Sequence, residues 1–89
     1  MKIQAELSLY PLKEAHLAPY IDSLLNTIRR QGLTVSVGLM STVIAGEREI
    51  VFQAISGGFA CVADQCKVVL VVKVSNACPA CLVEPGMIA

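Results

Sequence analysis

The hydrophobic period of this chain switches between two residues and three to four residues, and this alternation limits the folds open to it. Residues 2 to 10 alternate strictly between apolar and polar side chains, which predicts a half-buried strand that ends at Pro11. Residues 17 to 31 carry apolar side chains at helical spacing. The regular helix should begin near Ala18, because Pro19 fits only its first turn.

The same two periods then recur in the rest of the chain. Residues 33 to 39 alternate again, and the brief β-branched stretch at 43 to 45 follows them after the short link at 40 to 42, which predicts a hairpin. Residues 47 to 64 return to helical spacing. Residues 67 to 74 form a strand that is apolar on both faces over most of its length.

The predicted order is therefore β-α-β-β-α-β. Right-handed crossovers would place both helices on one face of a four-stranded antiparallel sheet, which is the ferredoxin-like arrangement of the α+β class. The other face of the sheet would be open. By alternation it would carry Gln4, Glu6, Ser8, Thr34, Ser36, Val69, Val71 and Lys73. Such a mixed polar and apolar face is typical of a subunit contact, so we expect a dimer or tetramer.

The second predicted helix contains two adjacent glycines. Its apolar side would carry Val51, Ala54, Ile55, Phe59 and Val62. Gly57 and Gly58 each cost about 1 kcal/mol relative to alanine in a helix interior. We expect them to bend the helix or to let it approach the sheet closely.

Composition excludes several classes of protein. The 89 residues leave room for one core, and 55% of them are hydrophobic. Seven basic residues balance seven acidic ones, which argues against a nucleic-acid binder or a polybasic membrane anchor. The longest aliphatic run, residues 68 to 72, is far too short to span a bilayer. Polar residues interrupt the first residues of the chain, so no signal peptide is expected and the predicted compartment is the cytoplasm.

Four cysteines lie in the last third of the chain, at positions 61, 66, 78 and 81. A reducing cytoplasm favours free thiols over disulfides. Their spacing matches a structural zinc site only in its second half. Cys78 and Cys81 have the C-x-x-C spacing of a redox pair, but the tail that follows contains Pro85 and Gly86 and predicts no helix whose N-terminus would lower a thiol pKa. Ordinary reduced thiols are the favoured interpretation.

The sequence lacks the residue patterns of most enzymes. The single histidine, His16, has no nearby acidic partner that fits the logic of a catalytic triad, and no serine has the context of a nucleophile elbow. Gly57 and Gly58 lie inside a helix rather than at its start, so they form no phosphate loop. No catalytic residue, metal ligand or cofactor is predicted, and binding is better supported than catalysis.

Three polar positions are candidates for binding. Ser41 and Thr42 place two hydroxyls at the junction of two strands, where turn chemistry is an equally good explanation. Glu6 lies on the polar face of the first strand, and a carboxylate in a sheet-face contact needs a partner. That partner is Lys73, a facing subunit or a cationic ligand.

Four stretches together resemble the thiamine/hydroxymethylpyrimidine-binding family, the YkoF-like proteins. They are Ala5–Leu12 with its Leu-Tyr-Pro-Leu exit, Gly38–Gly46 with its Met-Ser-Thr segment, Val51–Ile55, and Val72–Pro79 with its Ser-x-x-Cys ending. The match runs in consistent order over about residues 4 to 79.

The resemblance implies a ferredoxin-like unit at residues 1 to 79 that binds thiamine or its hydroxymethylpyrimidine half without transforming it, followed by a tail at 80 to 89. Some relatives carry two such units. This chain has one, so a homo-oligomer would supply the second.

The resemblance and the facing of the strands together indicate which residues would meet the ligand. Glu6 would pair with a cationic or protonated ring, and Tyr10 or Met40 would lie against a ring face. The hydroxyls that would meet the ring nitrogens and the amine are those of Ser8, Ser41 and Thr42. The alternatives are a ligand-free oligomeric interaction or regulatory module that uses the same open face and, less favoured, a thiol-redox protein that uses Cys78 and Cys81.

Overall fold

A computed structural model describes residues 1–13 and 18–77 of the chain. The elements follow one another in the order β-α-β-β-α-β, which confirms the predicted ferredoxin-like α+β class. They are β1 (Lys2–Pro11), α1 (Ala18–Arg29), β2 (Thr34–Val37), β3 (Thr42–Glu47), α2 (Arg48–Ala63) and β4 (Val68–Ser75).

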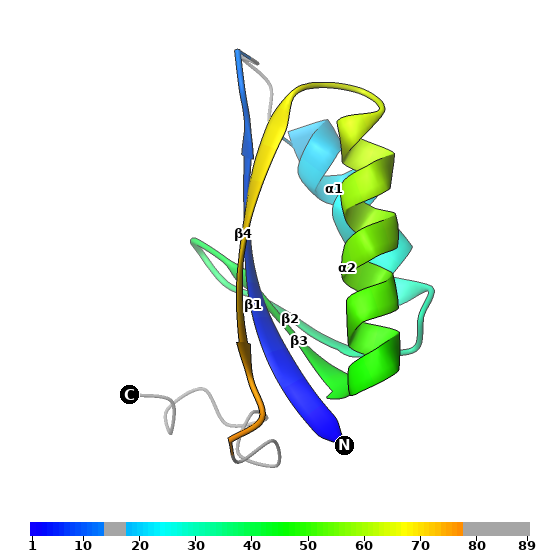
Figure 1. Cartoon of the computed structure of the whole chain (residues 1–89). Helices are drawn as coiled ribbons and strands as arrows, with labels where there is room; N and C mark the ends of the chain where they lie inside the picture. Colours follow the sequence, from blue (N-terminus) through cyan, green and yellow to red (C-terminus); the bar gives the residue numbers. More distant parts are fainter. Residues whose placement is uncertain (14–17, 78–89) are drawn as a thin grey trace.

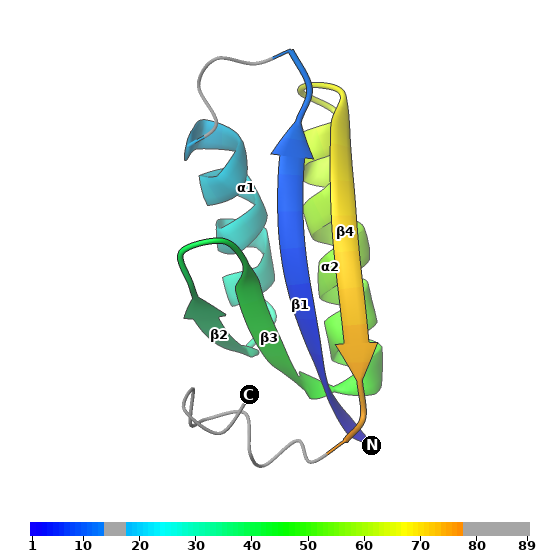
Figure 2. The same cartoon turned by 90° about the vertical axis from the view of Figure 1, so that its left-hand side faces the viewer.

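The strands form one four-stranded antiparallel sheet in the order β2-β3-β1-β4. Figure 1 shows the sheet edge-on, with α1 and α2 packed against the same side. Figure 2 looks onto the opposite side, where the described elements leave the sheet uncovered. We call this uncovered side the open face.

The core lies between the sheet and the two helices. Ile3, Ala5 and Leu7 of β1 are buried, in register with the strict alternation of that strand. The rest of the buried core comes from Leu24, Leu25, Ile28, Ile44, Val51, Ala54 and Val62. Truncating a large member such as Ile28, which is fully buried, to alanine would cost about 2–5 kcal/mol of stability.

The glycine pair of α2 serves the contact with α1, and not an approach to the sheet. A Cβ on Gly58 would lie 2.6 Å from Leu24 Cδ1 and 3.6 Å from Ile28 Cγ1, both on α1. A Cβ on Gly57 would meet only Thr27 Cγ2, at an ordinary 3.7 Å. Gly58 therefore allows the two helices to approach closely, and the expectation that the pair brings the helix near the sheet was wrong.

Two apolar residues are more exposed than their periodicity predicts. Leu39 was expected to end a strand, but β2 ends at Val37 and the Gly38 N–H donates to the Ser41 carbonyl at 2.8 Å. This bond closes a turn that carries Leu39 and Met40 at its tip, both almost fully exposed. Phe59 is 41% exposed, because Gly58 rather than Phe59 occupies the buried side of α2 beside α1.

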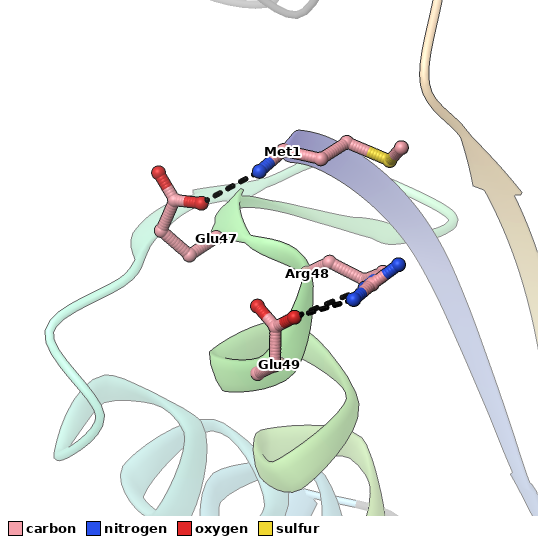
Figure 3. A network of polar contacts seen from close by, with 4 residues as sticks. All are labelled: Met1, Glu47, Arg48 and Glu49. Carbon is pink, nitrogen blue, oxygen red and sulfur yellow. Dashed lines mark hydrogen bonds and ion pairs between the residues drawn. The ribbon is translucent and has the colours of Figure 1, made fainter.

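Polar contacts fix the junction of β3 and α2 (Figure 3). The terminal amine of Met1 forms an ion pair with Glu47 at 3.1 Å, and the Arg48 N–H donates to the Met1 carbonyl at 2.9 Å. Arg48 also contacts Glu49 at 2.6 Å, and this hydrogen bond lowers the pKa of the Glu49 carboxyl. These contacts lie at the end of β1 that is remote from the 38–41 turn.

Neither helix in the described part of the chain has both the length and the apolar character needed to cross a membrane.

Candidate functional site

The strand register determines which side chains share the open face. Residues directly opposite one another on neighbouring strands point to the same side of a sheet. Glu6 lies opposite Val43 on β3 and Lys73 on β4. Ser8 lies opposite Val71, and the same pairing extends the face to Gln4, Tyr10, Thr34, Ser36, Ala45, Val69 and Ser75. The eight residues predicted for the open face all belong to it.

The open face has a polar end and an apolar end. Gln4 and Glu6, in the first half of β1, lie beside Ser75 and Lys73 near the end of β4, because the two strands are antiparallel. At the other end of β1, Tyr10 lies opposite Val69, and Val71 comes next along β4. These three apolar side chains are between 44% and 54% exposed. We call Tyr10, Val69 and Val71 the apolar end.

Glu6 is the centre of the polar end. Its Oε2 accepts a hydrogen bond from Ser41 Oγ at 3.2 Å, and its Oε1 lies 3.9 Å from Lys73 Nζ. Of the three partners considered for this carboxylate, the structure shows Lys73 within the same chain. The pair is loose and solvated, since the side chains of Lys73 and Glu6 are 80% and 44% exposed, so it adds little stability.

A shallow cavity of about 190 Å³ lies around this carboxylate. Its lining comes from three strands and consists of Gln4, Glu6, Val43, Lys73, Val74 and Ser75. We call it the open-face cavity. It presents one anion, one cation and neutral polar groups to solvent.

Thr42 lies on the other side of the sheet from Glu6. It pairs with Leu7, whose side chain points to the helices, and it is only 8% exposed. Ser41 immediately precedes β3, and its hydroxyl reaches Glu6 on the open face. The Thr42 side chain is instead buried on the helix side.

A second cavity lies where β1 extends beyond its pairing with the β2–β3 hairpin. β1 pairs with β3 only as far as Leu7, whereas its pairing with β4 continues to Pro11. Figure 2 shows this part of β1 with a strand on one side only. The cavity beside it measures about 130 Å³. We call it the notch; it is lined by Leu7, Ser8, Leu9, Ile21, Leu24 and residues 37 to 42.

The notch brings together four of the six predicted site residues, and Ser41 links it to a fifth. Ser8, Met40, Ser41 and Thr42 all line it. Ser41 also donates to Glu6, so one hydrogen bond connects the notch to a lining residue of the open-face cavity. Tyr10 lines neither: it is 54% exposed and lies four residues beyond Glu6, roughly 13 Å along an extended strand.

Sequence reasoning missed several lining residues. Gln4 and Ser75 line the open-face cavity. The alternation of residues 2 to 10 identified Gln4 only as a member of the open face. Ile21 and Leu24 of α1 form the apolar wall of the notch. Their spacing in the sequence marks them only as core residues.

The remaining sequence candidates add no chemistry in the part of the chain that the structure describes. Among residues 1–13 and 18–77, no three His, Cys, Asp or Glu side chains are grouped as a metal site would require. Cys61 and Cys66 are half-buried and form no disulfide with a described residue. The Ala77 N–H donates to Ser75 Oγ at 3.0 Å, which explains Ser75 as part of the turn that ends β4. His16, Cys78, Cys81 and the tail lie outside the described residues.

Comparison with known proteins gives this arrangement a context. A search of curated proteins found no significant match. Among solved structures, a hypothetical protein from Methanocaldococcus jannascii is similar with a TM-score of 0.78 and 26% identity, over 83% of this chain and 78% of that one. A protein from Streptococcus pneumoniae is similar with a TM-score of 0.79 and 22% identity, over 84% of this chain and 86% of that one.

A third solved structure carries a functional description. It is a candidate thiamine biosynthesis/salvage protein from Thermotoga maritima, with a TM-score of 0.76 and 19% identity, over 84% of this chain and 83% of that one. At 19% identity, this similarity shows only that the two proteins share a fold. The sequence profile of the family described as thiamine-binding protein matches residues 5–77, which include every lining residue of the notch and all those of the open-face cavity except Gln4. The chain is therefore a member of the thiamine-binding protein family.

Proposed function

We propose that this protein binds thiamine or its hydroxymethylpyrimidine moiety and releases it unchanged. Family membership supports a thiamine-related binding role. The observation that carries the finer proposal is the position of Ser41, which lines the notch and donates to Glu6 in the open-face cavity. A ligand made of two linked rings matches two cavities that the Ser41–Glu6 hydrogen bond connects.

The pyrimidine ring would occupy the notch. Leu7, Ile21 and Leu24 supply apolar walls, and Ser8, Ser41 and Thr42 line the same space with hydroxyl-bearing residues. Beyond Leu7 no described strand pairs with β1 on its hairpin side, so backbone groups of β1 are available there. An aminopyrimidine presents both donors and acceptors, and an uncovered strand edge offers both in return.

The thiazolium ring would lie over Glu6. Its permanent positive charge complements a carboxylate that the Ser41 hydroxyl already orients. Glu6 is half-exposed, so a ligand can reach it from the open face. Met40, at the tip of the turn and 91% exposed, would cover the ligand from the hairpin side.

A second copy of the chain would complete the site. The cavities of about 130 and 190 Å³ are each smaller than the roughly 300 Å³ at which small-molecule pockets usually begin. The apolar end, Tyr10 with Val69 and Val71, offers the contact surface for that copy. We therefore propose a homo-oligomer, dimer or tetramer, in the cytoplasm, with the ligand held beside the subunit contact.

Backbone amide NMR tests this placement. Thiamine added to the ¹⁵N-labelled protein should shift the amide signals of residues 7–9 and 38–42. The internal control is the surface around Gln31–Leu33, which lies beyond the far end of the hairpin and lines a separate cavity. Saturable shifts confined to that control surface would contradict the site, and unchanged spectra at millimolar thiamine would contradict the function.

A further inference from the structure

We propose that Lys73 sets the selectivity of this site between cationic and neutral ligands, an inference that rests on the proposed thiamine-binding function. Lys73 lies directly opposite Glu6 on the neighbouring strand, and its ammonium nitrogen is 3.9 Å from Glu6 Oε1. The position that a thiazolium would take next to this oxygen is therefore held by a cation of the protein itself.

The two carboxylate oxygens of Glu6 differ in how firmly they are engaged. Oε2 accepts from Ser41 Oγ at 3.2 Å, whereas Oε1 faces an ammonium beyond hydrogen-bond distance. The Lys73 side chain is 80% exposed, so it can swing into solvent at little cost. A cationic ligand can thus replace Lys73 at Oε1 while Ser41 keeps its bond to Oε2.

This replacement penalises a cation but not a neutral ring. A thiazolium must break the Lys73–Glu6 pair and then lie close to a displaced ammonium, whose like charge repels it. Hydroxymethylpyrimidine is uncharged at neutral pH and occupies the notch without touching the pair. The other neighbours of Glu6 on this face, Gln4, Ser8 and Val43, carry no charge that would mask the effect.

The experiment is to measure the dissociation constants of thiamine and hydroxymethylpyrimidine for the native protein and for Lys73→Met. Exposed ion pairs are worth little, so the expected change is a two- to fivefold gain in thiamine affinity with hydroxymethylpyrimidine affinity unchanged. Added salt should reduce the difference between the two proteins, because it screens solvated charges.

Two variants control for net charge and for folding. Lys67→Met removes the same charge at an exposed position six residues away, roughly 20 Å along an extended strand, and should leave the ratio of the two affinities as in the native protein. Lys73→Arg keeps the cation and should also keep the native ratio.

The outcomes separate this inference from the proposed function. Thiamine binding to the native protein with the same affinity ratio in Lys73→Met would overturn the role of Lys73 and leave the function standing. Equal changes for both ligands would also overturn it, because they indicate a general effect on the site. If neither ligand binds the native protein at millimolar concentration, the proposed function fails and the selectivity inference fails with it.

Discussion

Ser41 Oγ donates a hydrogen bond to Glu6 Oε2 across 3.2 Å, and the bond joins residues 35 positions apart in the sequence. It ties the turn of the β2–β3 hairpin to the middle of β1. The bond therefore keeps the turn next to the carboxylate. This is the relationship on which the two-cavity site depends.

The Ser41–Glu6 pair should act as one unit in ligand binding. Ser41→Ala and Glu6→Gln should each weaken thiamine binding, and we expect a coupling energy of about 0.5–1.5 kcal/mol between them in a double-mutant cycle measured by calorimetry. Glu6→Gln should have the larger effect, because it also removes the charge that faces the thiazolium. Strictly additive losses would show that the bond does not organise the site.

Thr42 should contribute through its hydroxyl alone. Thr42→Val keeps the shape of a side chain that is only 8% exposed, and we expect a loss of roughly 1 kcal/mol in thiamine affinity if that hydroxyl makes one neutral hydrogen bond to the ligand. Thr34→Val is the matched control, because Thr34 lies on the open face and lines neither cavity of the site. Equal affinity of both variants and the native protein would remove Thr42 from the site.

The apolar end of the open face should hold the subunits together. Val71→Lys should shift the protein to monomers in sedimentation experiments, because assembly would bury an unpaired charge. Phe52→Lys is the control: Phe52 is 49% exposed, close to the 44% of Val71, but it belongs to α2, which packs on the other side of the sheet. A native protein that sediments as a monomer at micromolar concentration would contradict the proposed contact.

The two glycines of α2 should differ in their response to alanine. Both substitutions gain about 1 kcal/mol from helix propensity. Only Gly58→Ala places a methyl group 2.6 Å from Leu24 Cδ1 in the core, and overpacking of this kind costs about 1–3 kcal/mol. Urea unfolding should therefore find Gly57→Ala more stable than the native protein and Gly58→Ala less stable than Gly57→Ala. The reverse order would contradict the close contact between the helices.

Local periodicity was sufficient to predict the fold. The alternation in residues 2 to 10 placed Ile3, Ala5 and Leu7 on the buried side, where the structure has them. The helix boundary near Ala18 followed from the position of Pro19. Both features depend on neighbouring residues only, which is why one sequence reveals them.

Features that depend on pairing between distant segments were not predictable. That Thr42 and Glu6 lie on opposite sides of the sheet follows from the register of β1 with β3, which no local pattern encodes. Likewise, the partner of Gly58 is Leu24 on another helix, so the sequence showed the glycine but not the surface it approaches. The exposure of Leu39 depends on the turn that the Gly38–Ser41 bond closes, which an alternating pattern does not reveal.

Calorimetric titration of thiamine into the native protein tests the central claim most directly. The account predicts saturable binding with a dissociation constant below 1 mM, roughly −4 kcal/mol or more favourable, and recovery of thiamine chemically unchanged after separation from the protein. Absence of binding at millimolar thiamine and hydroxymethylpyrimidine would contradict the account. In that case a ligand-free interaction module that uses the same open face would be the better description of this protein.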